Sequence, residues 1–136
     1  MKYILKKVGE APQIMQTDEK YTSNIWQRLY DSYYERIWLD SQRTLHMIVD
    51  EEGLLKKLPT NFLIEMNNPF SPVQRIVGDI IVARNKPLPF GGYDYETDDI
   101  TEEDMKILEN ILNSKYQAKL LPRIQSDNGG THIIRL

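Results

Sequence analysis

The sequence predicts a single α+β domain with a small mixed or antiparallel sheet, two main helices and a C-terminal hairpin or extended tail. The chain has 136 residues, which is close to the usual size of one domain. Hydrophobic residues make up 40% and charged residues 27%, a balance typical of globular rather than disordered proteins. Short alternating apolar segments are separated by Gly- and Pro-containing turns, and two longer segments carry apolar residues at helical spacing. We therefore expect residues 1–136 to form one mixed domain.

The first half of the chain predicts two hairpins with a helix between them. Residues 2–8 and 13–17 alternate modestly between apolar and polar side chains and indicate two strands joined by a turn. A helix over about residues 23–33 follows, because apolar side chains recur there at spacings of three and four. These side chains are Ile25, Trp26, Leu29, Tyr30 and Tyr33. The candidate N-cap residues are Thr22, Ser23 and Asn24. Residues 37–39 and 45–49 then predict a second hairpin.

The second half predicts one buried strand and one long helix. A short helical turn is expected at residues 61–65, and residues 80–83 form the best candidate for a buried strand. Gly78 precedes that strand and indicates a bulge or a close approach of two backbones. Residues 85–99 are rich in Pro, Gly and acids and predict a surface loop. Thr101 or Asp99 then caps a helix with an acidic first turn. The side chains expected to face the sheet from this helix include Ile107, Leu108 and Ile111.

Three stretches of the sequence carry a family resemblance. They are the opening strand with residues 9–12 (GEAP), residues 48–61 (IVDEEGLLKKLPTN), and residues 76–82 (IVGDIIV) followed by 100–104 (ITEED). In these stretches the chain resembles the phage and Gram-positive domain-of-unknown-function family numbered 3846, over residues 1–113. Residues 114–136 then form a C-terminal extension. The resemblance implies an α+β fold and a phage or prophage origin, but it implies no activity.

Composition and charge exclude several classes of protein. The chain has no cysteine, which removes disulfides, thiolate nucleophiles and sulfur-ligated zinc, and which fits a reducing cytoplasm. Its 17 basic and 20 acidic side chains give a net charge of −3, whereas nucleic-acid-binding proteins usually carry a basic excess. No apolar run approaches the roughly 20 residues of a membrane span, and no secretory signal is visible. The absence of cysteine favours the cytoplasm, and the family resemblance implies that of a bacterial host. We expect no membrane partner, and the net charge disfavours nucleic acid but leaves room for a local basic patch.

The ionisable side chains form no catalytic or metal-binding pattern. His46 and His132 are the only histidines, and neither has the spaced partners of a catalytic triad or a zinc site. His46 lies in an apolar strand, which favours a packed core residue. The acids at 50–52 could serve acid–base chemistry or a hard cation, but Gly53 follows them and a solvated turn explains them better. We therefore expect no enzyme activity, no metal and no cofactor.

Aromatic and basic side chains are the strongest candidates for ligand contacts. Aromatic residues crowd residues 21–38 near several arginines, where they could stack on a base or a nucleotide ring, although helical spacing favours core or dimer packing for some of them. Basic residues flank the strand at 80–83 and could contact a phosphate, although most such residues are simply exposed. The candidate ligand-binding residues are Arg28, Tyr34, Trp38, Asn61, Arg75, Arg84 and Lys86.

Three functional hypotheses follow. The leading one is a non-enzymatic phage or prophage binding protein that counters a host defence by holding a host protein or a small anionic ligand. The alternatives are a nucleic-acid-associated phage regulator that uses the aromatic and arginine cluster, and an enzyme whose site assembles from dispersed acids and His46. The aromatic helix and the apolar run at 131–136 also predict a homodimer, because pairing of two copies would cover both.

Overall fold

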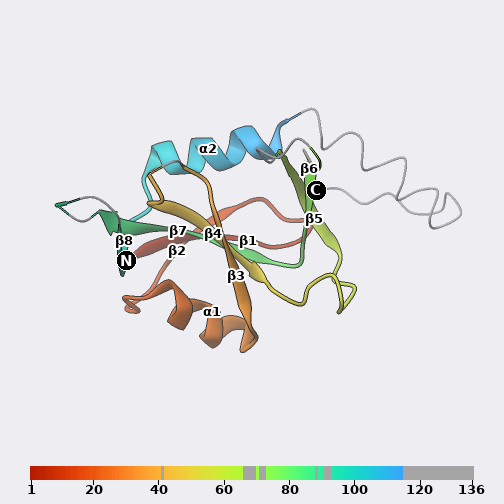
Figure 1. Ribbon diagram of the computed structural model, residues 1–136, viewed down its shortest axis with the longest axis horizontal. Coiled ribbons are helices and arrows are strands. Elements are labelled where there is room, and N and C mark those ends of the chain that lie inside the picture. The colour runs from red at the N-terminus through yellow and green to blue at the C-terminus, as the bar shows by residue number, and fades with distance from the viewer. Residues whose placement is uncertain (41, 66–69, 71–72, 88, 91–92, 115–136) are drawn as a thin grey trace, which may run out of the picture.

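A computed structural model describes residues 1–40, 42–65, 70, 73–87, 89–90 and 93–114 of the chain (Figure 1). The helices are α1 (Thr22–Tyr30) and α2 (Glu102–Leu112). The strands are β1 (Lys2–Lys6), β2 (Gln13–Gln16), β3 (Tyr34–Trp38), β4 (Leu45–Asp50), β5 (Thr60–Glu65), β6 (Val73–Val77), β7 (Ile80–Pro87) and β8 (Tyr93–Asp98). Every strand pairing among the described residues is antiparallel. The predicted α+β fold, with an antiparallel sheet and two helices, is confirmed.

Strand β7 lies at the centre of a six-stranded sheet. The sheet has the order β2-β1-β7-β4-β3, and β8 pairs with the end of β7 that extends beyond β1. Val82 in the middle of β7 lies opposite Ile4 of β1 on one side and Met47 of β4 on the other. This central position explains why residues 80–83 are apolar on both faces, as predicted for a buried strand. Strands β5 and β6 form a separate two-stranded sheet.

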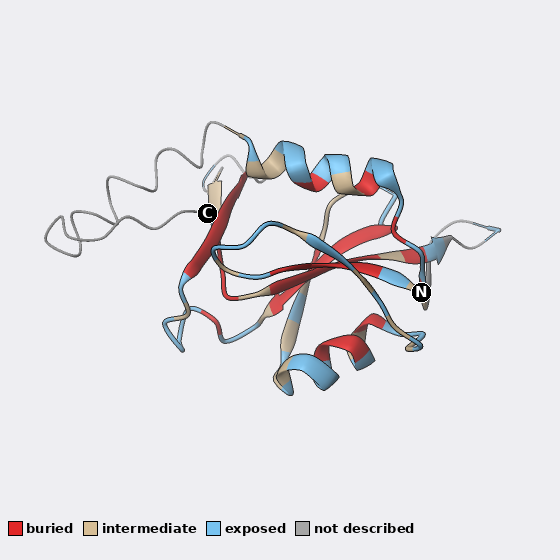
Figure 2. Ribbon diagram, turned by 180° about the vertical axis from the view of Figure 1, so that it is seen from behind, coloured by how far each residue is buried: buried red, intermediate tan, exposed pale blue. Residues whose placement is uncertain are grey.

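The six-stranded sheet separates two hydrophobic clusters, because successive side chains of a strand point to opposite faces. In β4, Met47 and Val49 belong to the larger cluster, whereas Ile48 between them belongs to the smaller one. Helix α2 and the β5–β6 hairpin contribute to the larger cluster, and α1 contributes to the smaller one. Figures 1 and 2 show the resulting layers, with α2 on one side of the sheet and α1 on the other.

Helix α2 begins where the sequence predicts it. The Thr101 side chain accepts a hydrogen bond from the Asp104 backbone N–H, and the Asp104 carboxylate accepts one from the Thr101 N–H. Leu108 is fully buried, as predicted, and Ile111 is partly buried against the larger cluster. The prediction for Ile107 is wrong, because this residue is 37% exposed. A step of one residue turns a helix by about 100°, so Ile107 and Leu108 lie on different faces.

Helix α1 is shorter than predicted and has a different N-cap. The cap residue is Tyr21, which makes no side-chain hydrogen bond to the helix, so the three predicted caps are wrong. The helix ends at Asp31, whose left-handed backbone (φ 45°) stops the helical path. Tyr33 therefore lies outside the helix and is 76% exposed, rather than packed on its apolar face. Leu29 is also exposed, so Ile25 and Trp26 are the helix residues that fill the core.

Two predictions for the second half of the chain are wrong. Residues 60–65 form strand β5 instead of a helical turn, since a short apolar run has no distinct period and pairing with β6 decides its conformation. Residues 85–99 contain the end of β7 and all of β8, so they are not one surface loop. Asn85 and Thr97 face each other in this pairing and are both fully buried. The predicted C-terminal hairpin lies outside the described residues.

Candidate functional site

Two adjoining cavities lie beside α1, at the end of the sheet where β4 leads into the turn at residues 51–57. The inner cavity has a volume of about 340 Å³ and the outer one about 480 Å³, and both are lined by Ser32 and Lys56. The inner cavity is also lined by Val8, Trp26, Tyr30, Asp50, Leu58, Pro59, Gly78 and Asp79. The outer cavity is also lined by Gln27, Asp31, Tyr33 and Glu52. We call the two cavities together the Lys56 cleft.

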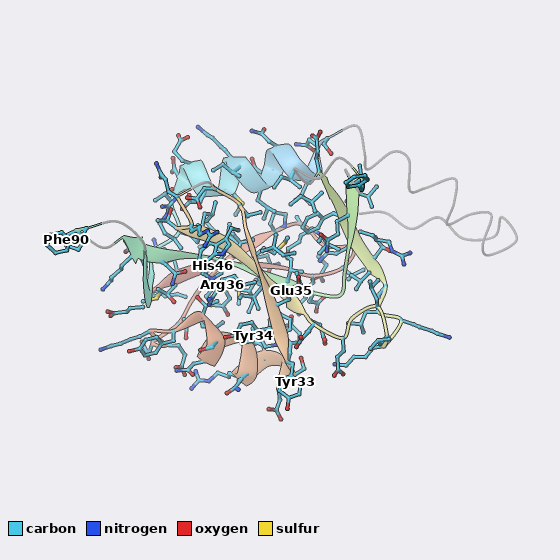
Figure 3. The ribbon with its side chains drawn as sticks, in the orientation of Figure 1. Tyr33, Tyr34, Glu35, Arg36, His46 and Phe90 are labelled. Atoms are coloured by element: carbon cyan, nitrogen blue, oxygen red, sulfur yellow. The ribbon has the colours of Figure 1, made fainter. Side chains whose placement is uncertain are left out.

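The end of α1 forms one wall of the Lys56 cleft. The left-handed backbone at Asp31 turns the chain out of the helix, and the Trp26 indole N–H donates to the Ser32 carbonyl at 3.0 Å. The Trp26 and Tyr30 rings pack at a centroid distance of 4.6 Å, which makes this wall aromatic. Figure 3 shows Tyr33 at the tip where α1 gives way to β3.

An ion pair lies on the boundary between the two cavities. Lys56 Nζ donates to Asp50 Oδ2 at 2.8 Å, and the Ser32 hydroxyl donates to the same oxygen at 3.3 Å. The Glu52 backbone N–H donates to Asp50 Oδ1 at 2.8 Å. Partial burial alone would raise the pKa of Asp50, but the hydrogen bonds from Lys56, Glu52 and Ser32 outweigh it and lower that pKa. The bond to Asp50 raises the pKa of Lys56.

A second carboxylate closes the inner end of the cleft. The Tyr30 hydroxyl donates to Asp79 Oδ2 at 3.2 Å, and the Val8 backbone N–H donates to Asp79 Oδ1 at 2.9 Å. Burial raises the pKa of Tyr30, and the charge of Asp79 raises it further. Gly78 places Asp79 here, because its φ is +75° and a β-carbon would lie 2.8 Å from Leu58 Cδ1. The Gly78 N–H also donates to the Pro59 carbonyl at 2.8 Å, which is the close backbone approach that Gly78 predicts from the sequence.

The Lys56 cleft is acidic. Its lining residues include four carboxylates and one ammonium group. The carboxylates are Asp31, Glu52, Asp50 and Asp79, and the ammonium belongs to Lys56. Asp31 and Glu52 are exposed at the outer cavity, whereas Asp50 and Asp79 are partly buried. The field at the entrance therefore attracts positive charge.

The basic residues predicted to bind an anion lie next to carboxylates and do not gather in one site. Arg28 lies on α1, and its Nη2 is 3.2 Å from Glu19 Oε1. Lys86 lies in the β7–β8 hairpin, and its Nζ is 3.3 Å from Glu96 Oε1. Arg75 on β6 borders a small hollow of about 60 Å³ together with three acids. These acids are Glu35, Asp50 and Glu51.

Arg84 is held by α2. Its Nε donates to Asp104 Oδ2 at 2.8 Å, an Nη donates to the other oxygen of the same carboxylate, and the second Nη donates to Thr44 Oγ1 at 3.3 Å. Asp104 is buried, which alone would raise its pKa, but the hydrogen bonds from Arg84 and Thr101 lower it. Arg84 therefore joins β7 to the first turn of α2.

The other predicted ligand residues also make internal contacts. Asn61 is fully buried; it accepts from Lys6 Nζ at 2.7 Å and donates to the Lys6 and Gly78 carbonyls at 2.9 Å each. Tyr34 and Trp38 share one face of β3 and are partly buried. Tyr34 packs against the smaller hydrophobic cluster, and Trp38 meets the His46 ring edge-on at 5.4 Å.

His46 is a buried core residue, as the sequence predicts. Its Nε2 lies 3.2 Å from Thr22 Oγ1, and its Nδ1 has no hydrogen-bond partner among the described residues. Burial, and secondarily the positive charge of Arg36, lower the pKa of His46 to about 3, although Asp40 acts in the opposite direction. The ring is therefore neutral at physiological pH. In the described part of the chain, no group of three His, Asp or Glu side chains is arranged to hold a metal ion.

The residues of the Lys56 cleft were not among the predicted site residues. The sequence favours a solvated turn for the acids at 50–52, which holds for the exposed Glu51 and Glu52 but not for the partly buried Asp50. Asp50 and Lys56 carry a weak sequence signal, because opposite charges flank the Gly53 turn. Nothing in the sequence links them to Tyr30 or Asp79, which lie on distant segments.

Comparison of the chain with family models, curated proteins and solved structures finds no match. The resemblance to the phage and Gram-positive family numbered 3846 therefore stays a prediction. Among the described residues, no helix has the length and apolar character needed to cross a membrane.

Proposed function

We propose that this protein is a non-enzymatic binding protein whose Lys56 cleft holds a positively charged group, an ammonium or a guanidinium. The observation that carries the proposal is the lining of the cleft, with four carboxylates against one ammonium. Its combined volume is in the range of small-molecule sites, which is about 300–1,000 Å³. The exposed Tyr33 ring at the outer cavity adds a surface over which a cation is attracted.

The protonation states of the cleft favour binding over catalysis. Ser32 is the one hydroxyl nucleophile that lines both cavities, and activating it would require a nearby base. Its partner Asp50 has a lowered pKa, which makes this carboxylate a weak base, and Lys56 stays protonated because its pKa is raised. The Tyr30 phenol has a raised pKa and donates to Asp79, so it does not act as a base either.

The charge of the cleft favours a cation over the small anion expected from the sequence. Among the described residues that line the cleft, Lys56 is the one cationic side chain, and its ammonium already bonds to Asp50. The basic residues expected to contact an anion lie beside carboxylates elsewhere, on α1, β6 and β7. An acidic cleft also disfavours nucleic acid, whose phosphates require basic surfaces.

Origin and assembly remain part of the proposal. The sequence resemblance supports a phage or prophage origin, and a role against a host defence fits a binding protein. A homodimer is expected from the aromatic helix and from the run at 131–136; Trp26 of that helix is buried in the core, and the run lies outside the described residues.

A chemical-shift titration at low salt tests the cation site. The probes are N-acetyl-lysine methylamide and spermidine as cations and inorganic phosphate as the anion. We expect both cations to shift the NMR signals of residues that line the cleft, and we expect phosphate to shift none of these signals. The double variant Asp31→Asn/Glu52→Gln should lower the affinity for the lysine probe about tenfold, because two of the four carboxylates lose their charge. Asparagine tolerates the left-handed backbone at position 31, so this change preserves the turn.

The matched control is Glu102→Gln/Glu109→Gln, which removes the same charge from exposed positions of α2. An equal loss of affinity in this control would mean that net charge, not the cleft, attracts the probe. Binding of phosphate in the cleft without binding of either cation would overturn the proposal.

A further inference from the structure

Exposed apolar side chains border the acidic Lys56 cleft. Tyr33 lines the outer cavity and is 76% exposed. Leu54 and Leu55 are 64% and 85% exposed, and they lie in the turn between Glu52 and Lys56, both of which line the same cavity. Apolar surface that water solvates poorly therefore lies at Tyr33 in the outer cavity and on the turn that contributes Glu52 and Lys56 to it.

The turn that carries the two leucines is held in one conformation by its backbone. The Lys56 N–H donates to the Glu52 carbonyl at 2.9 Å, and the Leu58 N–H donates to the Gly53 carbonyl at 3.0 Å. Gly53 packs against β6, because a β-carbon there would lie 2.7 Å from Val77 Cγ2. The turn is thus fastened to the sheet, and both of its leucines are exposed to solvent.

Leu54 also extends the apolar surface away from the cleft. It lines the small hollow on the far side of the turn, together with Ile76 and Val77 of β6. This hollow is also bordered by three acids and one basic residue, which are Glu35, Asp50, Glu51 and Arg75. A ligand that extends from the cleft across the turn therefore contacts apolar side chains, and carboxylates lie on both sides of the turn.

From this arrangement we infer that the occupant of the cleft is a lysine or arginine side chain of a partner protein, whose neighbouring apolar residues pack on Tyr33, Leu54 and Leu55. The inference rests on the proposed cation site. A free polyamine would use the carboxylates but would leave the leucines exposed. A basic residue within an apolar peptide segment matches both parts of the surface, by charge in the cleft and by apolar contact at its border.

A comparison of peptide probes tests the inference. The first probe is a blocked pentapeptide with lysine at its centre and leucine on each side; the second replaces that lysine by glutamine; the third is N-acetyl-lysine methylamide. We expect the lysine pentapeptide to bind at least about tenfold more tightly than the single blocked lysine, because only the peptide reaches the leucines. The glutamine peptide should bind at least about tenfold more weakly than the lysine peptide.

Two variants test whether the tighter binding of the lysine pentapeptide depends on the turn that carries Leu54 and Leu55. Leu55→Ser should remove the advantage of the lysine pentapeptide and leave the affinity of the single blocked lysine unchanged. Phe90→Ser is the matched control, because Phe90 is fully exposed and lies at the far end of the molecule (Figure 3). It should change neither affinity.

The outcomes separate failure of the inference from failure of the proposed function. If the blocked lysine binds but the pentapeptide binds no more tightly, the inference is wrong and the cation site stands. If neither lysine probe binds, or the glutamine peptide binds equally well, the proposed cation site is wrong. If light scattering shows twice the 16.0 kDa chain mass and Leu55→Ser restores the single mass, the occupant is a second copy and the inference is overturned.

Discussion

Asp104 and Asp50 are both partnered by a basic side chain, but they lie in different surroundings. The Asp104 side chain is 1% exposed, and its two oxygens accept hydrogen bonds from Arg84 and from the first turn of α2. The Asp50 side chain is 10% exposed, and its partner Lys56 lines both cavities of the cleft. The first pair is enclosed by the fold, whereas the second faces an open space.

The difference shows how one kind of interaction serves either the fold or a ligand. A guanidinium that binds a carboxylate through two bonds has little freedom to move, and Asp104 also completes a capping box. A lysine ammonium is a point charge on a flexible stem, so a competing cation can replace it beside Asp50. We therefore expect substitutions near α2 to change stability and substitutions in the cleft to change binding.

The largest expected effect is that of Asp104→Asn. The amide NH₂ would face the donors of Arg84 and Thr101, which leaves buried donors without an acceptor. We expect the free energy of unfolding in urea to fall by about 3–5 kcal/mol. The matched change Asp50→Asn should cost only about 1 kcal/mol, because water can reach the groups that Asp50 leaves unpaired. Equal losses in the two variants would contradict the comparison.

Packing of α2 against the larger cluster predicts the next effect. Leu108→Ala should lower the free energy of unfolding by about 2–5 kcal/mol, because the residue is fully buried. Ile107→Ala changes the neighbouring exposed residue and should cost less than about 1 kcal/mol. Thermal and urea unfolding of both variants measure the difference. An unchanged midpoint for Leu108→Ala would mean that α2 is not packed as described.

His46 predicts a pH dependence of stability on the α1 side of the sheet. The pKa of His46 is about 3 in the fold against 6.5 for an ordinary histidine, so the unfolded chain binds its proton first. The free energy of unfolding should therefore fall as pH drops below 6.5, by roughly 1 kcal/mol per pH unit. The lowered pKa of Asp104 adds a loss only at lower pH, below its ordinary value of 3.8.

Urea unfolding of the wild type and of His46→Phe between pH 7 and pH 4.5 checks this prediction. In this pH range the free energy of unfolding of the variant should no longer fall with falling pH, whatever its absolute value. If the variant and the wild type have parallel pH profiles, His46 is not the group that titrates.

The smallest expected effect on stability, and the sharpest test of the cleft, is that of Lys56→Met. Lys56 is exposed, so we expect the thermal midpoint to stay nearly unchanged. The affinity for N-acetyl-lysine methylamide should rise severalfold, because Asp50 no longer has an ammonium partner. A fall in that affinity would show that Lys56 contributes to the site instead of competing with the ligand.

Local sequence patterns predicted several elements of this fold correctly. The spacing of Thr101 and Asp104 predicts the start of α2, and the apolar run at 80–83 predicts the central strand. Gly78 indicated the close approach to the backbone of Pro59. Each of these features depends on residues near one another in the chain, or on one residue whose backbone freedom is required. The hydrophobic period and the chemistry of caps and turns are therefore sufficient to reveal them.

Pairing between distant segments decided the rest. Residues 60–65 are a strand because β6 pairs with them, and residues 93–98 are a strand because β7 extends to meet them. The Lys56 cleft joins Asp50 and Lys56 to Tyr30 and Asp79, and these residues come together only when the sheet forms. A sequence shows which side chains are charged, but the free energy that brings them together comes from burial and strand pairing across the whole chain.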